Sequence, residues 1–188
     1  MLSPRFKDAF DYAAQLHSKQ LRKGTQVPYI AHLMAVAALV FENGGDVDQA
    51  IAALLHDAVE DQGGYETLEE IQQKFGTRVA HIVDGCTDAY TDPKPPWRKR
   101  KENYLTRLYT ADADIQIVSL ADKLHNARCL LADLQKDGET VWSRFKGGKE
   151  GTLWYYRQLA NHYEKSSNNW LAEEYIRVVA QIEQTVQK

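Results

Sequence analysis

Hydrophobic residues recur along most of the chain at intervals of three and four, which is the spacing of a helix with one buried face. No stretch alternates hydrophobic and polar residues for long enough to predict a strand. The pattern predicts helices from Ser3 and Pro4 to near Gly24, and over residues 29–43, 46–59, 67–76, 77–88, 97–109, 112 or 114–133, 149–164 and 169–186. We therefore predict an all-α fold, a helical bundle that forms one domain over residues 1–188.

Local signals place several of these helix ends. Four side chains that can accept hydrogen bonds from free backbone N–H groups mark starts, at Ser3, Asp46, Thr67 and Thr77. Glycines predict stops at positions 44–45, 76 and 138. Three prolines predict a loop over residues 91–96, and residues 142–148 are rich in turn formers.

Composition limits the classes of function. With 44% hydrophobic and 26% charged residues, the 188-residue chain is typical of a globular protein with a substantial core. A net charge of −3 argues against nucleic-acid binding, so a phosphate ligand would need a local basic patch. The hydrophobic runs are too short to cross a bilayer, and because residues 1–7 contain no hydrophobic segment we expect no secretory signal. We expect a cytoplasmic protein, with Cys86 and Cys129 as reduced core residues.

The strongest local signal is a cluster of ionisable residues after the hydrophobic run 51–55. It contains His56, Asp57, Glu60 and Asp61, and residues four apart share one helix face. These groups would repel and desolvate one another unless a cation or bound water organised them. A solvated acidic helix end is the alternative interpretation, although acidic residues oppose the helix dipole at a C-terminus.

Two further segments carry candidate ligands. Asp122 lies in an otherwise hydrophobic helix, with Asn126 one turn later; a carboxylate paired with Lys123 or Arg128 at the surface is the alternative. The basic pair Arg22 and Lys23 precedes a glycine turn and then His32, which taken separately could equally be a core histidine.

Together, His32, His56, Asp57 and Asp122 resemble the four metal ligands of the HD phosphohydrolase superfamily, in the same order. Two imidazoles and two carboxylates suit Mn²⁺, Fe²⁺ or Mg²⁺ better than a thiolate zinc site. The phrases RKGTQVPYIAH, ALLHDAVED and LADKLHNAR resemble the hydrolase half of RelA/SpoT enzymes and the single-domain small alarmone hydrolases, over roughly the first two-thirds of the chain.

The resemblance implies a role for each matching residue. The four ligands would hold one Mn²⁺, and Glu60 with Asp61 would orient and activate the attacking water. Arg22, Lys23 and Asn126 would contact the nucleotide. The reaction implied is hydrolysis of a 3′-pyrophosphate, which returns a nucleoside 5′-di- or triphosphate and pyrophosphate. Two positions depart from the family pattern, since Leu33 replaces a proline and Cys129 replaces a threonine.

Other basic residues are candidates for holding the far phosphates. We expect Lys94 and Tyr155 to contact them, and residues 98–101 with Lys146 and Lys149 are further candidates. A solvated face is the simpler interpretation for most of residues 98–101. Among the remaining histidines, His17 is expected in the core or a pocket wall, and His125 beside the metal ligands.

Three hypotheses follow from these motifs. The first is an alarmone hydrolase, acting on guanosine or adenosine versions, for which we expect no synthetase half in this chain. The second is an HD nucleotidase or phosphatase on another phosphorylated nucleotide, such as NADPH. The third is a non-catalytic nucleotide sensor, against which the retention of Glu60 and Asp61 counts. The sequence leaves the oligomeric state open.

Overall fold

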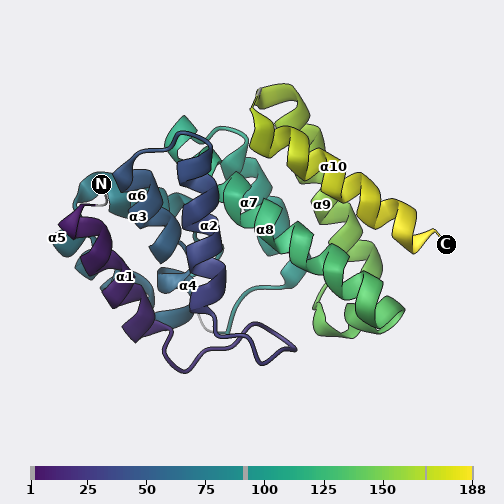
Figure 1. Cartoon of the computed structure of the whole chain (residues 1–188), viewed down its shortest axis with the longest axis horizontal. Helices are drawn as coiled ribbons and strands as arrows, with labels where there is room; N and C mark the ends of the chain where they lie inside the picture. Colours follow the sequence, from purple (N-terminus) through teal and green to yellow (C-terminus); the bar gives the residue numbers. More distant parts are fainter. Residues whose placement is uncertain (1–2, 91–92, 168, 188) are drawn as a thin grey trace.

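The computed structural model describes residues 3–90, 93–167 and 169–187, and these residues fold into an all-α bundle (Figure 1). The helices are α1 (Pro4–Leu16), α2 (Ile30–Glu42), α3 (Val47–Leu55), α4 (Ala58–Gln62), α5 (Gly64–Phe75), α6 (Thr77–Cys86), α7 (Trp97–Leu108), α8 (Ala113–Asp137), the 3₁₀ helix η1 (Gly138–Arg144), α9 (Gly148–Ser166) and α10 (Trp170–Val186). The predicted fold class is confirmed.

Helix α8 runs through the centre of the bundle and contacts elements on both sides. Helices α2, α3 and α6 pack against it on one side, and α10 packs on the other, where α9 also contacts α10 (Figure 1). The two ends of the chain lie at opposite ends of this arrangement. Because α8 is common to both groups, a side chain on it can meet residues from either half of the molecule.

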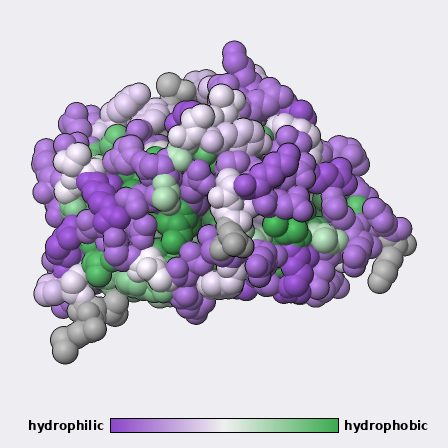
Figure 2. Space-filling view, turned by 90° about the horizontal axis from the view of Figure 1, so that it is seen from above, coloured by the Kyte–Doolittle hydropathy of each residue, from purple (hydrophilic) through white to green (hydrophobic). Residues whose placement is uncertain are grey.

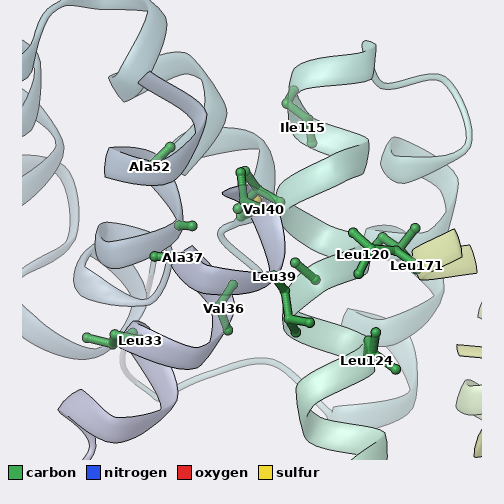
Figure 3. Close-up of a cluster of buried hydrophobic side chains, with 14 of the residues drawn as sticks. Leu33, Val36, Ala37, Leu39, Val40, Ala52, Ile115, Leu120, Leu124 and Leu171 are labelled. Carbon is green, nitrogen blue, oxygen red and sulfur yellow. The ribbon is translucent and has the colours of Figure 1, made fainter. Parts of the chain in front are cut away.

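The core forms where the hydrophobic face of α2 meets α8 (Figure 3). Leu33, Val36 and Val40 of α2 are fully buried. Figure 3 shows Leu39 of α2 next to α8, and Leu120 of α8 on the other side of that helix, beside Leu171 of α10. Burying one such side chain contributes about 1.5–3 kcal/mol relative to exposing it. The surface view is mainly hydrophilic, with hydrophobic residues reaching it in small groups (Figure 2). The three- and four-residue spacing in the sequence thus translates into one buried face per helix.

Several predicted helix ends are confirmed. Asp46 and Gln49 form the predicted capping box at the start of α3. Of the two candidate starts for the long helix, Asp112 is the N-cap, because its carboxylate accepts a hydrogen bond from the backbone N–H of Ile115. That helix ends at Gly138, whose φ of +59° favours glycine.

The first helix ends earlier than predicted, at Leu16 instead of near Gly24. Its continuation is replaced by a short hairpin, in which the backbone N–H of Arg22 donates to the carbonyl of Val27 at 2.8 Å. The N–H of Tyr29 donates to Gln20 at 2.9 Å in the same way. Since these groups pair across the hairpin, they are not available for an i to i−4 helix ladder.

The predicted helix over residues 46–59 is interrupted at His56 and Asp57, between α3 and α4. The Nδ1 atom of His56 lies 2.8 Å from the carbonyl oxygen of Ala53, which in a continuous helix would accept from the N–H of Asp57. A side chain therefore takes the place of a backbone donor, and the chain turns at the residues that carry the candidate ligands.

Smaller corrections concern the remaining ends. Thr67 lies in the first turn of α5 instead of capping it, because α5 begins at Gly64. Thr77 is the first residue of α6, which ends at Cys86, two residues before the predicted end. The long helix α8 continues to Asp137, beyond the predicted residue 133. In the predicted loop 91–96, residues 91–92 lie outside the described residues, and residues 93–96 are not helical.

Both cysteines are free, but only one lies in the core. Cys86 is buried, whereas Cys129 is half-buried and lines a cavity, so its predicted core position was wrong. Among the helices over the described residues, none combines the length and hydrophobicity needed to cross a bilayer.

Candidate metal centre and substrate cavity

Two imidazoles and two carboxylates from three parts of the chain meet at one point. His32 comes from α2, His56 and Asp57 from the break between α3 and α4, and Asp122 from the middle of α8. The Nε2 atom of His56 lies 3.0 Å from Asp57 Oδ2 and 3.6 Å from Asp122 Oδ1. The Nε2 atom of His32 lies 3.7 Å and 3.2 Å from the same two oxygens. The structure therefore brings together all four of the predicted ligands.

Each imidazole is oriented by a contact to its other nitrogen. The Nδ1–H of His56 donates to the carbonyl of Ala53, because a carbonyl can only accept. The Nδ1 of His32 lies 2.7 Å from Nδ1 of His125, so one of these two nitrogens donates to the other. Burial, His32 and Arg22 lower the pKa of His125 to about 4, which leaves it neutral and able to accept.

The Nε2 atoms of His32 and His56 indicate whether the four-residue cluster suits a cation. Both atoms are buried, and neither has a hydrogen-bond partner within the described residues. Buried polar atoms without partners are uncommon in folded proteins. An imidazole that donates from Nδ1 presents a lone pair at Nε2, which is the arrangement of a metal-binding histidine. With Asp57, these two residues form a group whose ligand atoms lie within 4.8 Å of one another. The donor set therefore fits a divalent cation.

Neighbouring side chains fix the two carboxylates. The hydroxyl of Tyr29 donates to Asp57 Oδ2 at 2.5 Å. The two carboxylate oxygens of Asp122 have different partners. Oδ1 faces the imidazoles, and Oδ2 accepts a hydrogen bond from Lys123 at 2.5 Å. Burial raises the pKa of Asp122, but the charge of Lys123 and the nearby His32 outweigh burial and hold that pKa well below its usual range. Asp122 is therefore ionised, and its pairing with Lys123 does not exclude it from the cluster.

The acidic pair after the break lies on the wall of a cavity beside this cluster. Glu60 accepts hydrogen bonds from Lys94 at 2.8 Å and from the backbone N–H of Asp88 at 3.2 Å. Asp61 accepts from Gln20 at 2.9 Å, and Lys94 lies 3.5 Å from its other oxygen. Both side chains are thus held by several donors from outside α4, in positions that line the cavity.

The cavity has a volume of about 690 Å³, and three of the four cluster residues line it, namely His32, Asp57 and Asp122. A basic part of its lining includes Arg22, Lys23 and Asn126. Arg22 donates to Asn126 Oδ1 at 2.6 Å, and Asn126 donates to Asp122 at 2.5 Å. A chain of hydrogen bonds therefore joins this basic part of the cavity to the candidate ligands.

The predicted phosphate contacts occupy different places. Tyr155 is buried and lines the cavity, with its ring 5.0 Å from the Nζ atom of Lys101. Lys94 is absent from the described cavity lining and instead pairs with Glu60. Of the basic residues at 98–101, 146 and 149, only Lys101 lines the cavity as described. Arg98 and Lys99 are exposed, as a solvated face requires, but Arg100 is buried and pairs with Asp88.

Several residues around the cluster were not identified from the sequence. Tyr29 and Gln20 contact the acidic residues from the hairpin and the start of α2, where no pattern distinguishes them from other polar residues. The sequence suggests Lys123 as a surface partner of Asp122, whereas in the fold it is half-buried beside that carboxylate. His17 is buried as expected, stacked on Tyr29.

The order and spacing of these ligands can be compared with known proteins. The family model described as "HD domain" matches residues 9–153, which include the cluster and the acidic pair. The chain belongs to the HD domain family. All four predicted ligands of this HD domain protein lie within the match, whereas Tyr155 lies just beyond it.

Similar proteins share much of this HD domain chain. It is 39% identical over 139 residues to the Xenopus tropicalis "Guanosine-3′,5′-bis(diphosphate) 3′-pyrophosphohydrolase MESH1", an alignment that covers 72% of this chain and 73% of that protein. It is 36% identical over 130 residues to a Myxococcus xanthus "GTP pyrophosphokinase", but covers only 17% of that longer protein. A relative from Mycobacterium leprae is matched over 15% of its length.

One solved structure is similar over nearly the whole fold. It was described under the words "A metazoan ortholog of SpoT hydrolyzes ppGpp and plays a role in starvation responses". The TM-score is 0.79 at 26% sequence identity, and the match covers 96% of each chain. Most of α9 and the whole of α10 lie beyond the HD domain match, and they are therefore part of an arrangement found in another protein.

Proposed function

We propose that this chain, as one domain over residues 1–188, is a cytoplasmic metal-dependent phosphohydrolase that removes the 3′-pyrophosphate of an alarmone nucleotide. The substrates would be (p)ppGpp, (p)ppApp or both, and the products a nucleoside 5′-di- or triphosphate and pyrophosphate. The observation that carries the proposal is the cluster of two buried imidazoles and two carboxylates beside Glu60 and Asp61, on the wall of a nucleotide-sized cavity. The name of the Xenopus relative supports the substrate class.

His32, His56, Asp57 and Asp122 would hold the cation, which we propose is Mn²⁺, with Fe²⁺ and Mg²⁺ as alternatives. When bound, it supplies a Lewis acid that lowers the pKa of water and neutralises charge on the phosphate. The protein's part is to keep both Nε2 lone pairs and both carboxylates pointing at one place. Ala53 and His125 fix the imidazoles for this purpose.

Glu60 and Asp61 would orient the attacking water and take up its proton. The water oxygen forms a bond to the first phosphorus of the 3′-pyrophosphate, the bond from that phosphorus to the ribose 3′ oxygen breaks, and the 3′ oxygen leaves with a proton. Hydrogen bonds to Lys94 and Gln20 limit the positions that the two carboxylates can adopt. Such positioning is a requirement of general acid–base catalysis.

The basic part of the cavity would hold the nucleoside and its 5′ phosphates. Arg22 and Lys23 supply cations there, and Asn126 supplies amide hydrogen-bonding groups next to the ligand Asp122. We propose that Tyr155 contacts phosphate elsewhere in the cavity, and that Lys94 acts close to the scissile bond through Glu60. No nucleic acid or membrane partner is part of this proposal.

The test is a turnover assay with purified protein and Mn²⁺. It would be offered ppGpp, pppGpp, ppApp, pppApp and NADPH, with products resolved by ion-exchange chromatography. Pyrophosphate together with an intact nucleoside 5′-polyphosphate is the expected result, and the rates give the base preference. Orthophosphate from NADPH alone would indicate a phosphatase instead. A complete lack of turnover, with cation demonstrably bound, would contradict the proposal and favour a nucleotide sensor.

A further inference from the structure

Part of the cavity lining consists of polar side chains that are buried or half-buried and lie next to the candidate ligand Asp122 in sequence or in space. We call this part, which is lined by Lys101, Tyr104, Lys123, Thr152 and Tyr155, the distal pocket. Thr152 and Tyr155 are only 3% and 6% exposed. The two lysine side chains are 18% and 16% exposed. Two ammonium groups and two buried hydroxyl-bearing side chains therefore line the same cavity.

The hydroxyls of the distal pocket lack partners. Both Tyr155 Oη and Thr152 Oγ1 are buried, and neither forms a hydrogen bond with any described residue. Burial raises the pKa of Tyr155 well above its usual value, so its hydroxyl keeps its proton as a donor. Leaving a buried donor unsatisfied costs about 1–3 kcal/mol. Two such groups one helical turn apart on α9, both lining the cavity, indicate a ligand that accepts hydrogen bonds.

The two ammonium groups surround the same aromatic ring. The Nζ atoms of Lys101 and Lys123 lie 6.0 Å and 4.9 Å from the ring centroid of Tyr104, and Lys101 Nζ lies 5.0 Å from that of Tyr155. Lys101 donates to Asp88 at 2.8 Å and Lys123 to Asp122 at 2.5 Å. An ammonium has three donors, so these bonds leave capacity for an anion. The ligand that satisfies both lysines and both hydroxyls is a phosphate-like group.

The distal pocket adjoins the metal centre directly. Asp122 presents Oδ1 to the two imidazoles and Oδ2 to Lys123, so a single carboxylate separates the centre from the pocket. A phosphate at the metal centre that carries a second phosphate would place that second group toward Lys123. The same cavity is also lined by Arg22 and Lys23, which are available for the rest of the nucleotide.

We infer that the distal pocket binds the terminal phosphate of the scissile pyrophosphoryl group, through Lys101, Lys123, Thr152 and Tyr155. This inference rests on the proposed function and adds to it the subsite for one phosphate of the substrate. The pocket selects nucleotides that carry a diphosphate at the cleaved position over nucleotides with a monophosphate there. A monophosphate would leave both hydroxyls of the pocket unpaired.

Tyr155→Phe is the most direct test, because the hydroxyl it removes bonds to no described residue and its loss therefore spares folding. Lys101→Met removes one cation while Asp88 keeps its pairing with Arg100. Tyr163→Phe is the matched control, two turns along α9, since its hydroxyl donates to Ser119 at 3.2 Å and lies outside the described cavity lining. Melting temperatures would confirm that each variant folds.

The first measurement is binding of inorganic pyrophosphate and orthophosphate by calorimetry, at matched free Mn²⁺ and with blank titrations. We expect the wild type to prefer pyrophosphate by at least about tenfold, and Tyr155→Phe and Lys101→Met each to reduce that preference by about tenfold, as for hydrogen bonds to charged groups. Tyr163→Phe should keep the preference and melt at a lower temperature. Equal binding of both anions by the wild type, or an undiminished preference in Tyr155→Phe, would overturn the inference.

The second measurement compares turnover of a nucleoside 3′-diphosphate with turnover of the same nucleoside 3′-monophosphate. The ratio of their kcat/KM values should fall about tenfold in Tyr155→Phe, since one donor to the terminal phosphate is lost. Turnover with no change in this ratio would be consistent with the proposed hydrolase activity, but it would contradict binding of the terminal phosphate in the distal pocket. If neither nucleotide were turned over, the proposed function would be wrong. The anion-binding measurement would still test whether the distal pocket binds a second phosphate.

Discussion

At the scale of single residues, His125 orients the candidate ligand His32 through a hydrogen bond. A carboxylate or a carbonyl oxygen more often has this role. The Nδ1 atom of His125 lies 2.7 Å from Nδ1 of His32, and His125 is neutral because its pKa is lowered to about 4 by burial, His32 and Arg22. It can therefore accept the Nδ1–H of His32 and direct the opposite lone pair toward the cation. A group of this kind typically affects affinity for the metal without touching it.

Replacing His125 by Phe should lower Mn²⁺ affinity by about 10- to 100-fold, the usual effect of losing such a partner. His125→Gln retains an acceptor of similar reach and should recover part of that affinity. Calorimetry with Mn²⁺ on both variants gives the measurement. If the two variants bound equally, the hydrogen bond to His32 would have no role beyond filling space.

A second residue-scale prediction separates holding the cation from activating water. Asp57→Ala should abolish both Mn²⁺ binding and turnover, because it removes a ligand. Glu60→Ala should keep the cation and lose most of the rate, about 10²–10⁴-fold if it serves as a general base. Metal content by mass spectrometry and kcat for both variants give the comparison. Normal turnover in Glu60→Ala would remove this residue from the mechanism.

Motif spacing was enough to select the residues that meet at the centre, because His32, His56, Asp57 and Asp122 do converge. It was not enough to describe their contacts. Nothing in the sequence indicates that Lys94 would pair with Glu60, since the two are 34 positions apart and Lys94 lies within the proline-rich loop. Such contacts depend on how separate helices dock, which a local pattern does not encode.

At the scale of elements, periodicity predicted where helices form better than where they end. The hydrophobic pattern continues through His56, but a side-chain bond to Ala53 interrupts the ladder there. The pattern also gave no sign that α1 stops at Leu16, because the hairpin that follows is stabilised by backbone pairing. The ends that were predicted well carry local capping chemistry, as Asp46 and Asn169 do. The two larger errors, at the end of α1 and at the α3–α4 break, lie next to the candidate site.

The end of α8 provides a prediction at this scale. Gly138 has φ +59° and ψ −147°, a conformation that strains any residue with a Cβ, although an added Cβ would meet no described atom within 4 Å. Gly138→Ala should therefore lower the free energy of unfolding by about 1–3 kcal/mol through backbone strain alone. The exposed residue Gln135 offers the control, since Gln135→Ala should change it by less than about 0.5 kcal/mol. Urea unfolding of both variants measures the difference, and equal stability would exclude strain at Gly138.

At the scale of the whole molecule, the candidate metal centre joins segments that are distant in the sequence. Its four ligands come from α2, the α3–α4 break and α8, and α8 in turn contacts α10 on its other side. The centre is therefore a crosslink within one half of the bundle, next to the helix that connects both halves. In the absence of a cation, its two carboxylates and two imidazoles remain buried close together, which is costly for any that are charged.

Binding of a cation should accordingly stabilise the folded chain as a whole. At a Mn²⁺ concentration 100 times the dissociation constant, a ligand that binds only the folded state adds about 2.7 kcal/mol. For a chain of this size, that corresponds to a rise in Tm of roughly 5–10 °C. Calorimetric melting with Mn²⁺ and after chelation measures the rise, and Asp57→Ala should show none of it. A wild-type Tm that chelation leaves unchanged would mean that the cluster forms without a cation, with its charges balanced by Lys123 and the imidazoles alone.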